Sequence, residues 1–299
     1  MQNGRNYADR QDRWLPAILL WPVLVLICVL VLGPLFWGIR VSFTDSRMIA
    51  LGFKIPFTLK NYSSVLTDPD TWAAVWVTIK FSMGTVIGSV VLGLAAALVL
   101  NLSFPGRAIV RALIILPWAV PHVVSALIWQ WLYNPDFGVI NYVLTLLPFV
   151  DKGPNWLSDP DFALTAVVIV NVWKTYPFAA LVFLAGLQTI PDEIYEASSI
   201  DGSGPIRRFV DITLPGLKHV MAIVVLLLLI WSFGNFVFIF LMTQGGPAAA
   251  TNALVVHIYF EAFQYFRAGS AFAMGSLLLV LSIMLAAFYA LITRRRQYG

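Results

Sequence analysis

The chain has 299 residues, of which 60% are hydrophobic and only 11% are charged, and its mean hydropathy is +0.82. A soluble domain carries about 25% charged residues, so this composition excludes an ordinary soluble enzyme and predicts a protein embedded in a bilayer. The net charge of +4 needs no nucleic acid partner to explain it.

Six apolar stretches each exceed the roughly 20 residues that a helix needs to cross the hydrocarbon core. Backbone polar groups must be paired within the bilayer, so these stretches are predicted to be helices rather than strands. Six crossings place both termini on the same side of the membrane. The stretches are residues 15–39, 73–100, 108–133, 162–190, 217–242 and 270–293.

The first stretch is predicted to remain as a membrane helix, not to be removed as a signal peptide. Its apolar core is too long, and no Ala-x-Ala cleavage site follows it. Trp14 and Trp37 lie near its two ends, as in an aromatic belt. Cys28, the single cysteine, lies within it, so no internal disulfide can form and we interpret it as a small apolar filler.

Lys and Arg residues predict the orientation, because cytoplasmic loops carry an excess of them. The richer side holds both termini and the loop 191–216, which we therefore place in the cytoplasm. The domain organisation follows as an N-terminal segment 1–14, a transmembrane domain 15–293 and a tail 294–299. The richer side carries Arg5, Arg10, Arg13, Arg107, Arg111, Arg207, Arg208, Lys218, Arg294, Arg295 and Arg296; the other carries Arg40, Arg47, Lys54, Lys60, Lys152 and Arg267.

Polar and aromatic residues gather on single faces of three predicted helices. Polar groups within a membrane span are costly and are functional candidates by default. Aromatic rings beside amides and hydroxyls suit a sugar, whose C–H faces stack on rings while its hydroxyls need donors and acceptors. The alternative is that the Asn and Ser side chains bond neighbouring helices. The three faces are Trp118 and His122; Asn171, Lys174 and Phe178; and Leu228, Trp231, Ser232 and Asn235.

Lys174 allows several interpretations. Its ammonium could neutralise an acidic group on a substrate, hydrogen-bond sugar hydroxyls, or pair within the helix bundle. The sequence does not decide between a neutral and an anionic substrate.

The cytoplasmic loop 191–216 is predicted to form two short helices around a glycine hinge. The first runs from Pro191 to Ile200 and packs Ile194 and Ile200 inward, with acidic residues at its positive end. Gly202 and Gly204 permit a sharp turn that residues with a Cβ resist.

The second helix of this loop is predicted to start at Pro205, and Pro215 resets the backbone before the fifth span. One reading is a docking surface for a soluble partner. The alternative is a connector that lies on anionic headgroups through Arg207 and Arg208.

The loop resembles the Glu-Ala-Ala-x3-Gly-x9-Ile-x-Leu-Pro loop of bacterial ABC importer permeases, which seats in a groove on the ATPase subunit. Ser198 departs from the pattern where Ala is usual, but it is small enough for close approach. Further segments are similar to the carbohydrate-uptake branch of maltose- or glycerol-phosphate-type permeases. They are Leu116-Pro117-Trp118-Ala119-Val120-Pro121, the stretch from Asn171 to Phe178, and Asn235-Phe236 followed by Thr243-Gln244-Gly245-Gly246-Pro247.

The resemblance implies an all-α membrane protein with six transmembrane helices in the ABC type I importer permease fold. It implies a chain that forms half of the translocation pathway and most of the substrate site, in the inner membrane of a bacterium. The implied partners are a second homologous permease subunit, an ATPase dimer that binds ATP and Mg²⁺, an extracytoplasmic solute-binding protein, a carbohydrate and membrane lipid. The binding protein would meet the outer segments 41–72, 134–161 and 243–269.

The resemblance also assigns residues to two roles. The positions that match the substrate-lining residues of maltose-type permeases are Trp118, His122, Asn171, Lys174, Phe178, Leu228, Trp231, Ser232 and Asn235. The positions that match the ATPase-coupling motif are Glu196, Ala197, Ser198, Asp201, Gly202, Ile212, Leu214 and Pro215.

Other functions are less consistent with the sequence. The chain has no Gly-x4-Gly-Lys-[Ser/Thr] loop, so ATP hydrolysis would belong to another chain, and no residue spacing suggests a catalytic or metal site. An importer for an anionic or phosphorylated polyol remains an alternative substrate class. An ion-coupled secondary carrier would need an acidic residue deep in a span, and none lies there. A purely structural permease partner would not need the polar faces.

Overall fold

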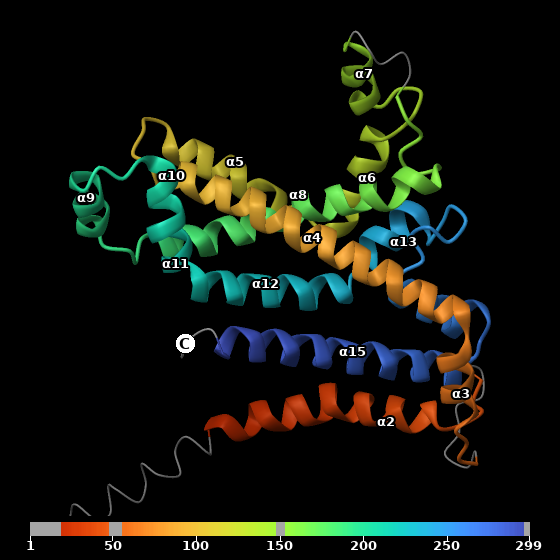
Figure 1. The fold of residues 1–299 in the computed structure, drawn as a ribbon. Coiled ribbons are helices and arrows are strands. Elements are labelled where there is room, and N and C mark those ends of the chain that lie inside the picture. Colours follow the sequence, from red (N-terminus) through yellow and green to blue (C-terminus); the bar gives the residue numbers. More distant parts are fainter. Residues whose placement is uncertain (1–18, 48–55, 148–152, 296–299) are drawn as a thin grey trace, which may run out of the picture. The chain divides into compact units, whose positions relative to one another are not determined.

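The structure, a computed structural model, describes residues 19–47, 56–147 and 153–295 (Figure 1). Regular structure in these residues is helical, apart from an isolated bridge between Thr44 and Phe57. The prediction of an all-α protein is therefore confirmed. The predicted segment 1–14 and most of the tail 294–299 lie outside the described residues. The described residues fall into two compact units, each considered by itself.

The smaller unit combines the described residues up to Thr67 with Phe260–Ser276. Its first helical run, Leu19–Ser42, contains a π-helical turn just before Pro34, which has no N–H to donate to that turn. The elements of this unit are η1 (Cys28–Leu32), α2 (Gly33–Ser42), α3 (Lys60–Thr67), η3 (Phe260–Gln264) and the first part of α15 (Ala268–Arg295).

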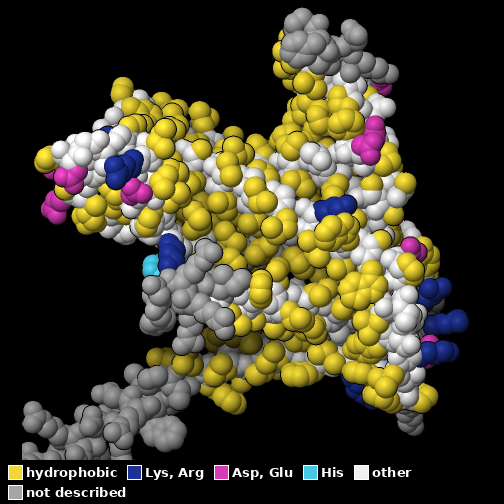
Figure 2. All heavy atoms as spheres, in the orientation of Figure 1, with side chains coloured by type: hydrophobic (Ala, Val, Ile, Leu, Met, Phe, Trp, Pro, Cys, Tyr) yellow, Lys and Arg dark blue, Asp and Glu magenta, His cyan; other side chains and the backbone are white. Residues whose placement is uncertain are grey.

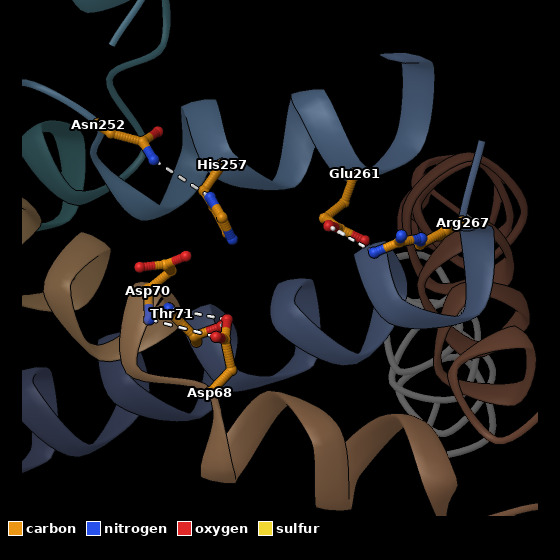
Figure 3. Close-up of polar contacts among 7 residues, drawn as sticks. All are labelled: Asp68, Asp70, Thr71, Asn252, His257, Glu261 and Arg267. Carbon is orange, nitrogen blue, oxygen red and sulfur yellow. Dashed lines mark hydrogen bonds and ion pairs between the residues drawn. The ribbon is translucent and has the colours of Figure 1, made fainter. Parts of the chain in front are cut away.

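Close aromatic and ionic contacts join these elements. The rings of Trp37 in α2 and Phe272 in α15 pack edge to face at 5.9 Å. Gly38 makes room for this contact, since a Cβ there would lie 2.9 Å from the Phe272 ring. Buried Glu261 of η3 pairs with the exposed guanidinium of Arg267 at 3.5 Å (Figure 3). The start of α15 therefore contacts α2, and the residue just before it pairs with η3.

The larger unit combines Asp68–Tyr259 with the residues from Leu277 onward. It holds the longest helices and both candidate sites. Its elements are α4 (Pro69–Asn101), α5 (Arg107–Ala119), α6 (His122–Leu132), α7 (Val139–Thr145), α8 (Pro160–Leu187), α9 (Asp192–Ile200), α10 (Pro205–Arg208), η2 (Phe209–Thr213), α11 (Leu214–Gly216), α12 (Lys218–Phe233), α13 (Val237–Thr243), α14 (Leu254–Tyr259) and the rest of α15.

The helices α4 and α8 pack against each other more extensively than any other pair in this unit, and Figure 1 shows them side by side. Small residues allow this approach: a Cβ at Gly88 would lie 2.6 Å from Val172, and one at Gly93 would lie 2.6 Å from Ala179. Helices in lipid associate by such close packing, because lipid tails are as apolar as the side chains that they touch. The core continues onto α12, where Leu228 is buried.

The start of α4 is capped by Asp68. Its carboxylate accepts hydrogen bonds from the backbone N–H groups of Asp70 at 3.3 Å and Thr71 at 3.0 Å, and from the Thr71 hydroxyl at 2.7 Å (Figure 3). On α14, His257 hydrogen-bonds through Nδ1 with Asn252 at 3.2 Å. Helix starts leave backbone N–H groups without intrahelical partners, which explains the Asp at this position.

The predicted third span, 108–133, is not one continuous helix. It divides into α5 and α6, which are bent by 99°. Val120 adopts an extended backbone and Pro121 lacks the N–H that would continue the helix. The prediction that Trp118 and His122 share one helical face is therefore wrong in its geometry, because they lie on opposite sides of the break.

The predicted fifth span, 217–242, is also interrupted. The helix α12 ends at Phe233, and Gly234, Asn235 and Phe236 separate it from α13. Asn235 consequently lies in the turn after α12 rather than on the helix itself. At its other end α12 follows a 67° bend from the segment Pro205–Gly216.

The segment between α6 and α8 folds around Asn141 of α7. Its amide donates to the carbonyl oxygen of Pro154 at 3.2 Å and accepts from the indole N–H of Trp156 at 2.7 Å. The described part of the predicted outer segment 134–161 is thus joined to α7 by these hydrogen bonds.

Four helices of the described residues are long and apolar enough to cross a membrane, and the number rises to six if each of two bent pairs counts as one span. Figure 2 shows hydrophobic side chains over most of the visible surface, as contact with lipid requires. Figure 2 also shows both acidic and basic side chains over α9 and α10. The four helices are Leu19–Ser42, Pro69–Asn101, Pro160–Leu187 and Ala268–Tyr289; the bent pairs are α5 with α6, and Pro205–Gly216 with Lys218–Phe233.

Candidate functional site

A cavity of about 470 Å³ opens between the helices of the larger unit. This volume falls in the range of small-molecule sites, which is roughly 300–1,000 Å³. Of the nine residues predicted to bind substrate, eight line the cavity. Its lining is Thr85, Trp118, His122, Asn171, Lys174, Thr175, Leu228, Trp231, Ser232 and Asn235. The lining residues lie on α4, α5, α6, α8 and α12, except Asn235, which lies in the turn after α12. The cavity therefore depends on the packing of five helices.

A chain of amide and hydroxyl groups crosses one wall. Asn235 donates from Nδ2 to Oδ1 of Asn171 at 2.9 Å, and Asn171 donates to the Thr85 hydroxyl at 3.1 Å. Each amide nitrogen carries two hydrogens and uses one in this chain. The two Asn residues therefore join α4, α8 and the turn after α12, and also present polar groups to the cavity.

Lys174 is buried, with 3% of its surface exposed. Its ammonium donates to the carbonyl oxygens of Pro117 at 3.1 Å, Trp118 at 2.9 Å and Val120. In the described part of the chain, it has no carboxylate partner. The charge is thus held by backbone carbonyls at the bend between α5 and α6.

Two indole rings give the cavity broad apolar faces. Trp118 and Trp231 keep 50% and 44% of their surfaces exposed. Phe178, the ninth predicted residue, packs against the ring of Trp231 at 4.7 Å and does not line the cavity. The His122 ring lies 5.4 Å from that of Phe238. Phe178 therefore supports the lining residue Trp231.

Sequence reasoning missed two lining residues, Thr85 and Thr175. Thr175 lies one turn after Asn171, and its hydroxyl meets that of Ser89 at 2.8 Å. A hydroxyl four residues from a candidate Asn was a signal for Thr175. Nothing in the sequence indicated Thr85, because its pairing with α8 depends on tertiary packing.

The predicted glycine hinge is present between α9 and α10. Gly202 has a φ of +77°, and no other atom lies within 4 Å of where its Cβ would be. The two helices are tied together by Arg208, which donates to the Ser199 hydroxyl at 2.8 Å. The start of α10 at Pro205 agrees with the prediction, while α9 begins at Asp192 with Pro191 as its cap.

The packing predicted for the first loop helix is wrong. Ile194 and Ile200 were expected to face inward, but they are 47% and 87% exposed, and Ile206 is 80% exposed. A helix of nine residues at the end of the bundle has little of the chain to pack against. The isoleucines are instead exposed apolar side chains on a loop that also carries charged residues.

The residues 89–298, which include α8, the glycine hinge and α12, match the family of binding-protein-dependent transport system inner membrane components. The chain belongs to this family. Its members are ABC transporter permeases, which are transport subunits of the inner membrane. The resemblance inferred from the hinge loop and the polar spans is thereby confirmed.

Two relatives match over nearly their whole lengths. The sulfoquinovosyl glycerol transport system permease protein SmoG of Agrobacterium fabrum is 34% identical, covering 98% of this chain and 94% of that protein. The trehalose/maltose transport system permease protein MalF of Thermococcus litoralis is 36% identical, covering 92% and 90%. Both relatives are named as permeases of transport systems for sugars or sugar derivatives.

A solved structure has the same fold. It is a bacterial alginate ABC transporter in complex with an alginate pentasaccharide-bound periplasmic protein, and one of its chains matches with a TM-score of 0.82. The match covers 99% of each chain at 21% sequence identity. The likeness establishes the type I permease architecture for this chain.

Proposed function

We propose that this permease subunit belongs to an ATP-driven importer that takes up a carbohydrate through the cavity between α4, α5, α6, α8 and α12. Relatives at 34% and 36% identity are named for sugar systems. The observation that carries the proposal is the cavity wall itself: Trp118 and Trp231 flank the amide chain of Asn171 and Asn235. Flat apolar rings beside oriented amides fit a sugar, which has C–H faces and hydroxyl edges.

The surface around Gly202 would dock an ATPase dimer that binds ATP and Mg²⁺. Exposed Ile200 and Ile206 beside charged residues suit burial against a partner. A second permease would complete the pathway, and a solute-binding protein would deliver the sugar to the outer segments. ATP-driven closure of the ATPases would move the loop and shift the permease between two states that expose the cavity to opposite sides.

An ion-coupled secondary carrier fits the cavity less well. Such carriers hold their coupling ion with acidic or backbone groups at the midplane. Of the described residues that line the cavity, none is Asp or Glu. Uptake that persists without any ATPase partner would favour the carrier.

The proposal predicts that Asn235→Ala weakens sugar binding. The variant removes an amide group that can hydrogen-bond a sugar hydroxyl, and a lost hydrogen bond costs about 1–3 kcal/mol. This corresponds to roughly 5- to 150-fold weaker binding at 1.4 kcal/mol per decade. The measurement is the concentration dependence of uptake of labelled maltose, trehalose and sulfoquinovosyl glycerol, in cells that express the chain with its partner subunits. Basal ATPase activity should be retained, because the hinge loop is untouched.

Trp231→Ala should weaken uptake in the same way by removing a stacking face. The matched control is Trp76→Ala, since Trp76 is also a partly exposed indole, at 57%, but lies on α4 outside the cavity lining. If Asn235→Ala and Trp231→Ala leave uptake and preference unchanged, these residues only pack helices and the cavity is not the substrate site.

A further inference from the structure

We propose that Lys174 is a positioning residue: its ammonium holds the bend between α5 and α6, and thereby sets Trp118 and His122 in the cavity wall, instead of binding the substrate. This inference rests on the proposed function for its consequence in uptake. Its structural part concerns the bend alone and can be tested without any substrate.

The donor count supports this role. An ammonium has three N–H groups and no acceptor. The three partners of Lys174 are the carbonyl oxygens of Pro117, Trp118 and Val120. All three donors are therefore committed to backbone, and the buried position of Lys174 leaves little room to exchange them for a substrate.

The bend leaves backbone carbonyl groups that require hydrogen-bond donors, and Lys174 provides them. At the end of α5 the last carbonyls lose their intrahelical partners, and Pro121 cannot donate to Pro117. A buried carbonyl without a partner is destabilising. These carbonyls also form the negative end of the α5 dipole, where a cation is favourable. One lysine from α8 satisfies both requirements.

The geometry of the bend determines how the residues on either side of it are oriented. Trp118 lies in the last turn of α5 and His122 begins α6, and both line the cavity. A change in the 99° bend would turn these two side chains relative to each other. Lys174 thus acts on the substrate through the orientation of its neighbours.

The proposal implies an alternative backbone state in the absence of the ammonium. Without the ammonium, the chain can pair Trp118 with the N–H of His122, and Val120 with that of Val124, by continuing the helix through Pro121. A kinked helix through proline is tolerated in membranes. Loss of Lys174 should therefore straighten or broaden the bend instead of leaving it intact.

The test is a distance measurement between spin labels on the two helices. Cys28 is the single native cysteine, so a Cys28→Ser background accepts labels at Ile109→Cys in α5 and Leu127→Cys in α6. Both positions are exposed. In a straight helix these Cα atoms would lie about 27 Å apart at 1.5 Å per residue, and the bend shortens this distance.

The chain with Lys174 should give one short, narrow distance distribution in the assembled transporter. Lys174→Met, which has no donor, should shift the distribution toward the straight-helix value or broaden it. Lys174→Arg keeps donors and charge and should restore much of the short distance. An unchanged distribution in Lys174→Met would overturn the proposal.

If Lys174→Met does not accumulate in the membrane, Lys174→Gln carries the test, because its amide has two donors for three carbonyls. A Lys174→Gln distribution identical to that of the parent would likewise overturn the proposal. Uptake adds an independent measure, with maltose as the neutral probe and sulfoquinovosyl glycerol as the acidic one. The variants should weaken both by a similar factor; selective loss of the acidic probe would assign Lys174 to the substrate instead. If Asn235→Ala has no effect on uptake, the proposed function fails, but the spin-label distances still test the role of Lys174 in the bend.

Discussion

At the scale of single residues, Asp68 is a helix cap whose charge can be tested directly. Burial raises the pKa of its carboxyl, but hydrogen bonds from Thr71 and from the backbone of Asp70, together with the nearby His257, outweigh burial and lower the pKa below 3.8 (Figure 3). Asp68→Ala should reduce the free energy of unfolding near pH 7 by about 0.5–2 kcal/mol, as for other caps. Thermal unfolding of the detergent-solubilised protein measures this loss.

The pH dependence of this effect has a definite sign. A carboxyl with a lowered folded pKa stabilises the protein above its unfolded pKa of 3.8, and the contribution disappears as the pH falls through the lower folded value. The difference in free energy of unfolding between the parent and Asp68→Ala should therefore become smaller below about pH 3.8. Asp68→Asn is the control, because it keeps a cap oxygen but cannot titrate. A gap that widens in acid would contradict this account.

The polar residues show where sequence reasoning succeeds and where it stops. Asn171 and Asn235 were found because an amide inside an apolar stretch is conspicuous, and their side chains do meet in the cavity wall. The partners of Lys174 could not be found, since they are carbonyls more than fifty residues away. A backbone carbonyl becomes available only when a helix breaks, and no side-chain pattern records that.

At the scale of elements, a substitution at Gly202 can distinguish backbone strain within the loop from lost contact with a partner. A positive φ costs an L-residue about 1–2 kcal/mol, although Asp tolerates it better than most. A Cβ at Gly202 would meet nothing within 4 Å in this chain. Gly202→Asp should therefore insert normally but lose nearly all transport, along with the ATPase stimulation caused by loaded binding protein, because it adds bulk and charge where an ATPase would dock.

The control for this prediction is Gly106→Asp. Gly106 has a similar φ of +83° and is equally open, but it precedes α5 outside the hinge loop. It should transport like the parent. Equal loss in both variants would point to backbone strain, and normal stimulated ATPase activity in an assembled Gly202→Asp complex would remove the case for docking.

Element positions follow closely from hydropathy, but their continuity does not. The predicted spans 73–100 and 162–190 correspond to the helices Pro69–Asn101 and Pro160–Leu187. Hydropathy averages over a window, so it registers an apolar segment equally well whether it is straight or bent by 99° at Pro121. Proline is common in membrane helices and is no certain sign of a break.

At the scale of the whole molecule, the number of crossings decides on which sides the termini lie. If each bent pair is one span, the described helices cross six times and both termini share a side. If one pair turned back within the membrane, the count would be five and the termini would lie on opposite sides. The fold and the family were predictable from composition and the hinge motif, but this parity depends on what the bends do.

Reporter fusions show whether the number of membrane crossings is even or odd. We predict that a reporter active only in the cytoplasm gives signal at Gly299, because Arg294 and Arg295 close the last span and cytoplasmic flanks are rich in such residues. A reporter active only outside the cytoplasm should give signal when inserted after Pro247, in the segment that follows α13. Matching insertions after Ser203 should behave like Gly299, because the hinge loop must face the ATPase. A silent cytoplasmic reporter at Gly299 with an active one after Ser203 would mean that the segment between them crosses an odd number of times, and the six-span arrangement would be wrong.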